Sequence, residues 1–369
     1  MKRKVLTLEK RYFKTLTVLL LALLIPLGVN AQTGKIFDAD KQLSSSYTNQ
    51  VYLDRDGFIW VVTRNGLNRY DGYQFHTIKK EQNTQQGMAS NYVNCMIQDR
   101  NGLFYMGMYG ALQTYDGSRF ENVEVKDVEG SVVSCYMTCF LLRNSGEMLA
   151  GTSGHGVLRI VDSRHASQVG GVLRDVHTVN GLLEDTKGHV WIVTPNMGLL
   201  EYDGKLVHRY FTDDAMSNAV RCLCLDHDGN IYVGTSTNGV YVRSAKGGEF
   251  RHLDVLGNKH IAALYCCRDG RLMVGFDGQG VAAYYPQKGT MEDNPYYSRE
   301  VSLNLSKVYS IVEDANGNIW LGLLQKGVFM QSGETTGFGY MGYKLGSQNI
   351  IGEACVVSTC VDSKNRVWV

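Results

Sequence analysis

The chain has 369 residues, 20% of them charged, and a formal net charge of +1 at pH 7. It carries no basic stripe, which excludes nucleic acid as an expected partner of this segment. Its 41 glycines, 4 prolines and 44% of hydrophobic residues are typical of a folded, turn-rich chain and exclude a disordered one.

Residues 1–31 are predicted to form a secretory signal peptide. A basic lead that includes Lys2, Arg3 and Lys4 precedes an apolar run over residues 16–27, and Val29-Asn30-Ala31 fits a small-residue cleavage site. The apolar run is too short for a comfortable bilayer span, although an uncleaved anchor is the alternative. In both cases we expect the rest of the chain to be periplasmic.

One short pattern recurs along the chain every 41 to 47 residues. Its constant element is a turn glycine, found at Gly57, Gly102, Gly146, Gly188, Gly229, Gly270 and Gly317. A period of this size indicates a repeat architecture. An eighth copy begins at Cys360 and is incomplete at Val369.

Each copy is predicted to contain a β-hairpin, because an apolar alternating run leads into Asp-x-x-Gly and a second run follows. The glycine permits φ > 0 at a tight turn, and the aspartate can accept hydrogen bonds from turn amides. The copies that carry both residues are Asp54/Gly57, Asp99/Gly102, Asp185/Gly188, Asp226/Gly229 and Asp314/Gly317.

A large side chain follows each turn glycine by three residues. It is aromatic in Trp60, Tyr105, Trp191, Tyr232, Trp320 and Trp368. Leu149 and Met273 replace the ring in two degenerate copies. We therefore expect the position to require bulk rather than a particular ring.

Two further strands complete each repeat. The second strand ends near a pair such as Gly151-Thr152, a short polar loop closes on another glycine, and the third strand often finishes as Tyr70-Asp71-Gly72 does. A fourth strand is expected around residues such as Phe75 and Phe120. Four strands in about 40 to 45 residues form one blade of a β-propeller.

The sequence therefore predicts an all-β fold, a seven-bladed β-propeller of four-stranded antiparallel blades over residues 33–346, plus the start of an eighth repeat. Residues 347–369 would be the first hairpin of a truncated repeat, belonging to a second propeller. Two hypotheses describe the closure of the ring. Either Lys35-Ile36-Phe37 adds an outer strand to the last blade, or blade seven supplies its own outer strand near residues 338–343.

Nine cysteines in an exported chain would ordinarily predict a disulfide framework. Five of them occupy repeat-equivalent positions on predicted first strands: Cys95, Cys139, Cys222, Cys224 and Cys360. Equivalent positions in different blades are not generally within the Cα separation that a bridge needs, so we expect mostly buried, unpaired thiols. Bridges between Cys135 and Cys139 or between Cys355 and Cys360 are the alternative.

Motifs for catalysis and for metals are missing from the sequence. It contains no Gly-x-Ser-x-Gly, Walker loop, His-Glu-x-x-His or dinucleotide fingerprint. Cys222-x-Cys224 has no second pair for zinc, and the Asp-x-Asp-Gly sequences lack the closing glutamate of an EF-hand. We therefore expect no enzyme activity, no metal site and no cofactor, and assign the recurring aspartates to turns.

The consensus Val-x-x-Ile-x-x-Asp-x-x-Gly-x-Ile-Trp-x-Gly-Thr-x-x-Gly-Leu-x-x-Tyr-Asp resembles the two-component regulator propeller repeat. The clearest copies run over residues 56–72 and 314–322, and the resemblance covers roughly residues 33–369. It implies the N-terminal periplasmic sensor region of a hybrid two-component system that acts as a homodimer. The membrane helix, histidine kinase, receiver and output domain would lie downstream, so membrane contact is expected only through that missing part.

Loops on one rim of a propeller gather side chains from every blade, and function concentrates in loops on a rigid scaffold. The loops after the second strands carry the candidate ligand-binding residues Arg64, Tyr109, His155, Asn196, Asn238, Gln279 and Lys326. Hydrogen-bonding side chains beside a stacking ring suit sugars, so the expected partner is an oligosaccharide or another small periplasmic ligand. A secreted lyase or hydrolase acting on a polysaccharide and a protein-binding scaffold are the alternatives.

Overall fold

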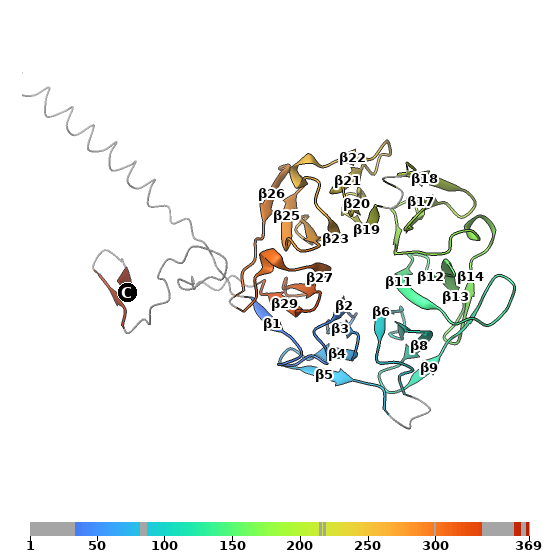
Figure 1. The fold of residues 1–369 in the computed structure, drawn as a ribbon, viewed down its shortest axis with the longest axis horizontal. Helices are drawn as coiled ribbons and strands as arrows, with labels where there is room; N and C mark the ends of the chain where they lie inside the picture. The colour runs from blue at the N-terminus through green and yellow to red at the C-terminus, as the bar shows by residue number, and fades with distance from the viewer. Residues whose placement is uncertain are drawn as a thin grey trace, which may run out of the picture.

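The structure is a computed structural model that describes residues 34–81, 87–213, 216, 219–298, 300–333, 358–362 and 367–368. Seven sheets stand around a central axis (Figure 1), so the predicted seven-bladed, all-β propeller is confirmed. The first strands of the blades face the axis and contact one another around the ring. Blade 1 begins at β2, and the blades follow in chain order to blade 7, which begins at β27.

Each blade is an antiparallel meander that runs outward from the axis. The innermost strands are β2 (Thr48–Leu53), β6 (Val93–Gln98), β11 (Tyr136–Leu142), β15 (Gly181–Glu184), β19 (Val220–Leu225), β23 (Ile261–Cys266) and β27 (Val308–Glu313). The second strands are β3 (Ile59–Thr63), β7 (Phe104–Met108), β12 (Met148–Ser153), β16 (Val190–Val193), β20 (Ile231–Thr235), β24 (Leu272–Phe276) and β28 (Ile319–Leu323).

The outer half of each blade completes this pattern. The third strands are β4 (Gly66–Tyr70), β8 (Ala111–Tyr115), β13 (Val157–Ile160), β17 (Leu199–Tyr202), β21 (Val240–Arg243), β25 (Val281–Tyr285) and β29 (Gly327–Gln331). The fourth strands of blades 1 to 6 are β5 (Phe75–Ile78), β9 (Phe120–Asn122), β14 (His165–Gln168), β18 (Val207–Tyr210), β22 (Arg251–His252) and β26 (Thr290–Asp293). Single-turn 3₁₀ helices η1 (Gly171–Leu173), η2 (Asp254–Leu256) and η3 (Leu303–Leu305) lie in connections between blades.

The two ends of the ring meet in blade 7. Strand β1 (Lys35–Phe37) pairs antiparallel with β29, with Ile36 opposite Phe329, and becomes the fourth strand of that blade. The first closure hypothesis therefore describes the ring, and the alternative outer strand at residues 338–343 lies outside the described residues. This pairing joins the N-terminal strand to the last blade and removes an exposed sheet edge.

Blade 3 departs from the four-strand pattern. Strand β10 (Glu124–Lys126) leaves blade 2 and pairs with β14 in parallel, so this sheet has five strands. The sequence pattern did not indicate the extra strand, because its alternation of charged and apolar residues spans only three positions.

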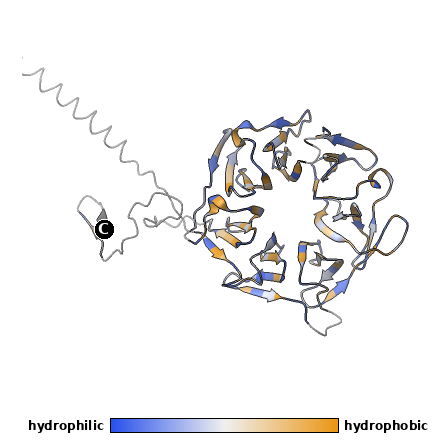
Figure 2. Ribbon diagram, in the orientation of Figure 1, coloured by the Kyte–Doolittle hydropathy of each residue, from blue (hydrophilic) through white to orange (hydrophobic). Residues whose placement is uncertain are grey.

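The hydrophobic core lies between the blades. The second strands β3, β7, β20, β24 and β28 are buried along their whole length, whereas outer strands such as β26 are mostly exposed and hydrophilic (Figure 2). A glycine on the second strand lets the next blade approach closely. A Cβ on Gly107 would lie 2.3 Å from the Cβ of Met137 in blade 3, which explains the small residue there.

The recurring aspartate joins the turn to the buried aromatic. In blade 1, Asp54 Oδ1 accepts the amide hydrogens of Asp56 and Phe58, and Oδ2 accepts the indole N–H of Trp60 at 2.8 Å. Blades 4 and 7 repeat this geometry, with Trp191 bound to Asp185 at 3.0 Å and Trp320 bound to Asp314 at 2.9 Å. The side chains involved are buried, so each carboxylate satisfies three donors that would otherwise lose water.

The expectation that bulk alone fills the aromatic position was therefore wrong for these blades, where the ring also donates a hydrogen bond. The two degenerate copies show why. In these copies Arg143 and Cys267 replace the turn aspartate, and Leu149 and Met273 replace the aromatic residue. The hydrogen-bond acceptor and the indole donor are therefore lost together. In blades 1, 4 and 7 the position therefore depends on the aspartate and the indole together, and not on a bulky ring alone.

The cysteines follow the expectation of unpaired thiols. All eight that the structure describes are free, and Cys95, Cys135, Cys224 and Cys267 are buried. The alternative bridge between Cys135 and Cys139 is absent, and Cys355 lies outside the described residues. Burial raises the pKa of Cys139 to about 11 and that of Cys222 to about 12.

We expect these thiols to resist alkylation at pH 8, because only the thiolate reacts and burial disfavours it. Labelling of Cys139 and Cys222 in the folded protein should be about 100-fold slower than labelling of exposed Cys360. Peptide mass spectrometry after brief iodoacetamide treatment measures this directly. Rapid modification of Cys222 without unfolding would contradict the raised pKa of its thiol.

Near the C-terminus, β30 (Cys360–Val361) and β31 (Val367–Trp368) pair antiparallel, with Cys360 opposite Trp368. This is the hairpin expected for the eighth copy. The predicted boundaries at residues 33–346 and 347–369 remain predictions. The proposed signal peptide, residues 1–31, lies outside the described residues.

Candidate ligand-binding rim and central channel

The meander gives the propeller two different faces. The aspartate turns, between first and second strands, lie on the same face as the turns between third and fourth strands; we call this the aspartate face. The turns between second and third strands lie on the opposite face with the connections between blades; we call this the rim face. Each face gathers contributions from all seven blades.

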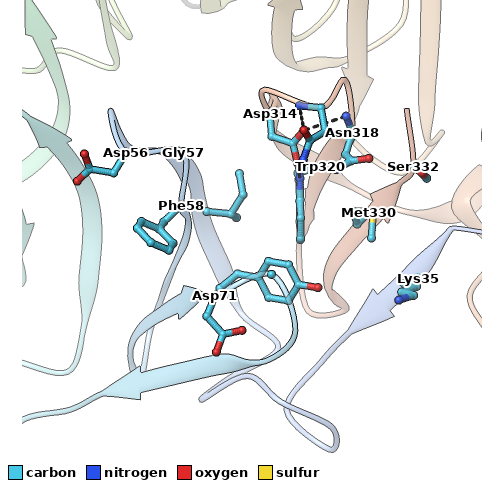
Figure 3. A pocket seen from close by; sticks show the side chains of 14 residues that line it. Lys35, Asp56, Gly57, Phe58, Asp71, Asp314, Asn318, Trp320, Met330 and Ser332 are labelled. Carbon is cyan, nitrogen blue, oxygen red and sulfur yellow. Dashed lines mark hydrogen bonds between the residues drawn. The ribbon is translucent and has the colours of Figure 1, made fainter. Parts of the chain in front are cut away.

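The aspartate face has a groove of about 410 Å³ between blades 7 and 1. Figure 3 shows Asp314 in this groove bound to Trp320 and Asn318, with Asp56 and Asp71 on the facing blade. The carboxylate of Asp71 also accepts two turn amides and contacts His76, and these hydrogen bonds lower its pKa to about 2. Asp314 and Asp71 therefore have roles in maintaining the turns.

Three ligand-type side chains converge in blade 4, where Asp185, His189 and Glu201 bring their atoms within 4.8 Å of one another. Each already has a partner in the protein. Asp185 holds its turn and Trp191, His189 Nδ1 lies 2.8 Å from Glu201 Oε1, and Tyr210 donates to Glu201 Oε2 at 2.6 Å. We read this group as a hydrogen-bonded network that fixes the outer half of the blade.

The rim face is built on turns that are fixed by threonine. In blades 3, 4 and 5, the hydroxyl of a threonine at or directly after the end of the second strand donates to a glycine carbonyl and accepts an amide from the turn. Thr235 does this with Gly239 and Asn238. The same arrangement holds at Thr152 and Thr194. These bonds fix the turn backbones, so side chains on the rim project from rigid positions.

Five residues form a continuous aromatic surface over blades 1 to 3, which we call the aromatic arc. They are Tyr47, Arg64, Tyr92, Tyr109 and Tyr136. The guanidinium of Arg64 lies 4.8 Å from the ring centroid of Tyr47 and 5.6 Å from that of Tyr92. Tyr109 then contacts Tyr92 at 6.2 Å and Tyr136 at 6.3 Å between ring centroids, while 71% of it remains exposed.

The arc arises from repeat-equivalent positions. Tyr47, Tyr92 and Tyr136 each lie ten residues before the turn glycine of their blade, and Arg64 and Tyr109 each directly follow a second strand. Tyr136 donates to Asn94 Oδ1 at 3.0 Å, and Gln325 donates to the Tyr47 hydroxyl at 2.8 Å. Gln325 adopts a φ of 65°, a left-handed conformation that costs energy in a residue with a side chain. The aromatic rings are thus held in place by polar neighbours.

A second set of side chains, His260, Asp277, Lys307 and Tyr309, lies on the rim face over blades 6 and 7. Asp277 is at its centre, with Lys307 Nζ at 2.7 Å and His260 Nδ1 at 3.5 Å from its oxygens. Burial alone would raise the pKa of Asp277, but the bond to the Lys307 ammonium outweighs it and lowers the pKa below its ordinary value. The hydroxyl of Tyr309 also bonds to this carboxylate.

Between the arc and this charged set lies the central channel, a cavity of about 460 Å³ lined by the first strands of all seven blades. One residue per blade, eight positions before the turn glycine, stands in its wall: Asn49, Asn94, Thr138, Asn180, Arg221, Ala262 and Tyr309. In six of the seven blades this residue is the extra one of a β-bulge. Bulges commonly re-aim side chains beside functional sites.

On one side of the channel these residues bond blade to blade. Asn49 Nδ2 donates to the carbonyl of Val93 at 2.6 Å, and Asn94 Nδ2 donates to that of Met137 at 2.7 Å. Thr138 continues the series to Val179. The series fastens the first strands of blades 1 to 4 under the aromatic arc.

The structure brings together two of the seven predicted rim residues, Arg64 and Tyr109, both in the aromatic arc. Asn196 and Gln279 are exposed on blades 4 and 6. Lys326 donates to Ser306 at 3.1 Å.

His155 and Asn238 donate their backbone amides to the turn threonines, and the side chain of Asn238 lies against Met216. These two therefore have positions within the turns, and a ligand role for any of the seven remains a prediction.

Sequence reasoning missed the tyrosines at the start of the first strands, or directly before them, and it missed the bulge residues. A signal was available, because both sets keep a fixed distance from the turn glycine, at ten and at eight residues. The ligand-binding residues predicted from the sequence lie only in the loops after the second strands. The bulge, which places the eighth residue before the glycine in the channel wall, leaves no mark in the alternation of apolar residues.

Two segments of the chain, residues 215–237 and 302–324, match the family model of the two component regulator propeller. Both segments contain a first and a second strand joined by an aspartate turn, in blades 5 and 7. The chain carries two-component regulator propeller repeats. No curated protein sequence matches it.

Solved structures with the same fold include extracellular domains of two-component systems. The extracellular domain assigned to a hybrid two-component system of B. thetaiotaomicron superimposes with a TM-score of 0.74 at 20% identity, over 91% of this chain and 46% of that one. A second such domain from the same bacterium gives 0.67 at 16%, over 85% and 44%.

A streptogramin B lyase gives a TM-score of 0.63 at 12% identity, over 81% of this chain and 97% of the lyase. At these identities the likeness establishes the fold alone. The chain spans slightly under half the length of the two extracellular domains. Within the described residues, no helix has the length and apolar character needed to cross a bilayer.

Proposed function

We propose that this chain is the ligand-sensing propeller of an exported hybrid two-component sensor. In this proposal it binds an oligosaccharide in the periplasm, without cleaving it, and acts within a homodimeric receptor. Ligand binding would shift the arrangement of that dimer and so signal to a cytoplasmic kinase that lies outside these residues. The propeller repeats and the extracellular sensor domains of the same fold support the assignment to such a receptor.

The observation that carries the ligand class is the aromatic arc. Sugars present flat apolar faces edged by hydroxyl groups, and exposed aromatic rings with nearby polar groups match both features. Tyr109 offers such a ring, and the guanidinium of Arg64 offers hydrogen-bond donors in the same arc. The charged set across the channel adds donors and acceptors within the same face.

Calorimetric titration of the chain with a panel of neutral and acidic oligosaccharides tests the proposal. Tyr109→Ala should weaken the binding of any ligand found by about 3- to 30-fold, because a stacking ring is lost. Tyr73→Ala is the matched control, since Tyr73 is 85% exposed on the aspartate face and should leave binding unchanged.

Equal effects of the two substitutions would place the ligand elsewhere. Cleavage of a glycosidic bond by the purified chain would contradict a purely sensory role and favour the lyase or hydrolase alternative. Chromatography of each oligosaccharide after prolonged incubation detects such cleavage.

A further inference from the structure

The wall of the central channel has an unusual distribution of charge. Arg221 is the only charged side chain among the described residues that line the cavity, and no carboxylate faces it there. The other bulge residues are neutral: two of them in adjacent blades, Asn49 and Asn94, are tied to neighbouring carbonyls. Arg221 is half-buried on β19 and forms no ion pair with any residue that the structure describes.

A guanidinium that is partly removed from water and lacks a carboxylate is costly to maintain unless another anion neutralises it. Three of the four other half-buried arginines among the described residues have such partners, and the fourth, Arg69, lies over the rings of Phe58 and Trp60. Arg143 contacts Glu147 at 2.6 Å and Glu184 at 2.9 Å, and Arg243 lies 3.7 Å from Glu201. Arg271 also contacts Asp269 at 2.6 Å. Within the described part of the chain, Arg221 thus differs from the other half-buried arginines in having neither an ion pair nor an aromatic ring against its guanidinium.

The surroundings of Arg221 extend the positive potential. Tyr309 lines the same cavity, close enough for the charge of Arg221 to act on its hydroxyl, and Lys307 lies beside Tyr309. The single carboxylate nearby, Asp277, is already shared by Lys307 and His260. An anion that entered from the rim face would therefore meet a guanidinium that has no ion pair, in a cavity that the amide side chain of Asn180 also lines, with little competing negative charge.

We propose that the central channel binds an anionic group, a carboxylate or a sulfate, through Arg221. This inference rests on the proposed function for the source of the anion, and it narrows the ligand class to acidic oligosaccharides. The acid would enter the channel while the attached sugar rings contact the aromatic arc. Guanidinium groups match carboxylate and sulfate oxygens with two parallel hydrogen bonds, which a neutral sugar does not offer.

The first test uses inorganic sulfate as the probe, with sodium chloride of equal ionic strength as the reference. A ligand that binds only the folded state raises the unfolding midpoint, so sulfate should stabilise the wild-type chain more than chloride does. Sulfate also stabilises folded proteins in general, because it is excluded from their surfaces, so the site is measured by the part of the difference that Arg221→Gln removes. Sulfate should stabilise Arg221→Gln less than it stabilises the wild type. Arg251→Gln is the matched control, because Arg251 is exposed on the outer strand β22 of the same blade, and it should behave as wild type.

The second test compares trigalacturonate with its methyl ester, in which neutral ester groups replace the charged carboxylates on the same sugar chain. Arg221→Gln should weaken trigalacturonate binding by about 10- to 100-fold and leave the ester unaffected. Arg221→Lys should give an intermediate affinity, since it keeps the charge and loses the second hydrogen bond. Binding of the acid, but not of the ester, should weaken with added salt.

The outcomes separate this inference from the proposed function. If neutral sugars bind the arc and Arg221→Gln changes neither sulfate nor uronate binding, the channel site is wrong and the sensor proposal stands. If no sugar binds but stabilisation by sulfate depends on Arg221, the anion site stands and the oligosaccharide proposal falls. A lower unfolding midpoint of Arg221→Gln in the absence of ligand would show that this substitution destabilises the fold. In that case the comparison of Arg221→Lys with the wild type tests the site instead.

Discussion

Replacing Trp191 with alanine should lower the free energy of unfolding by about 3–5 kcal/mol, the largest effect expected from a single substitution in a blade interior. The indole is fully buried between blades 4 and 5, stacks on Tyr210 at 5.4 Å between ring centroids, and donates to Asp185. Removing it leaves a cavity and also leaves a buried carboxylate oxygen without its donor. Chemical denaturation monitored by circular dichroism measures the change.

Two further variants separate packing from hydrogen bonding at this position. Trp191→Phe keeps most of the apolar contact but removes the donor, and Asp185→Asn keeps the shape but places an amide group among three donors, so each should cost about 1–3 kcal/mol. Met273→Leu is the control, because Met273 occupies the equivalent position in a blade without the aspartate. It should cost less than about 1.5 kcal/mol. A Trp191→Ala protein as stable as wild type would refute the paired role of aspartate and indole.

Replacing Phe37 with alanine should also destabilise the protein by about 3–5 kcal/mol, because this side chain holds the closure of the ring. Phe37 lies on β1, the strand that completes blade 7, and its side chain is buried. Its ring stacks on that of Trp320 in the same blade, with 5.9 Å between the ring centroids. It also contacts Phe75 of blade 1 at 5.2 Å. A single side chain therefore joins the N-terminal strand, the last blade and the first blade.

A double-mutant cycle with Trp320→Ala tests this closure. Because Phe37 and Trp320 are in contact, the two changes should be non-additive by about 0.5–3 kcal/mol. The cycle of Phe37→Ala with Trp191→Ala is the control, since Trp191 belongs to a distant blade, and those effects should add. Additivity in both cycles would show that β1 does not support blade 7 in solution.

Much of this fold follows from the sequence, because the blade is encoded locally. The aspartate turn, the glycine and the large residue after it lie within about ten residues of one another, so their spacing alone locates the first hairpin of every blade. Ring closure by residues 35–37 was one of two hypotheses. It depends on a contact between the ends of the ring, which no local pattern records.

The candidate site was harder to predict, because its residues come from several blades rather than from one. Arg64 and Tyr109 stood out as loop residues, but Tyr92 and Tyr136 resemble ordinary strand-edge tyrosines until the ring brings them together. Arg221 resembles an ordinary exposed residue of an alternating strand. Its place in the channel depends on a bulge, which changes the direction of one side chain without changing the residue pattern.

Hydroxyl-radical footprinting of the chain, with and without saturating trigalacturonate, tests the central claim most directly. We predict that Tyr47, Tyr109 and Tyr309 become protected from oxidation when the ligand binds, while Tyr73 on the aspartate face stays as reactive as before. Protection confined to Tyr73 and Phe58, with the rim tyrosines unchanged, would show that the wrong face of the propeller has been assigned to the ligand.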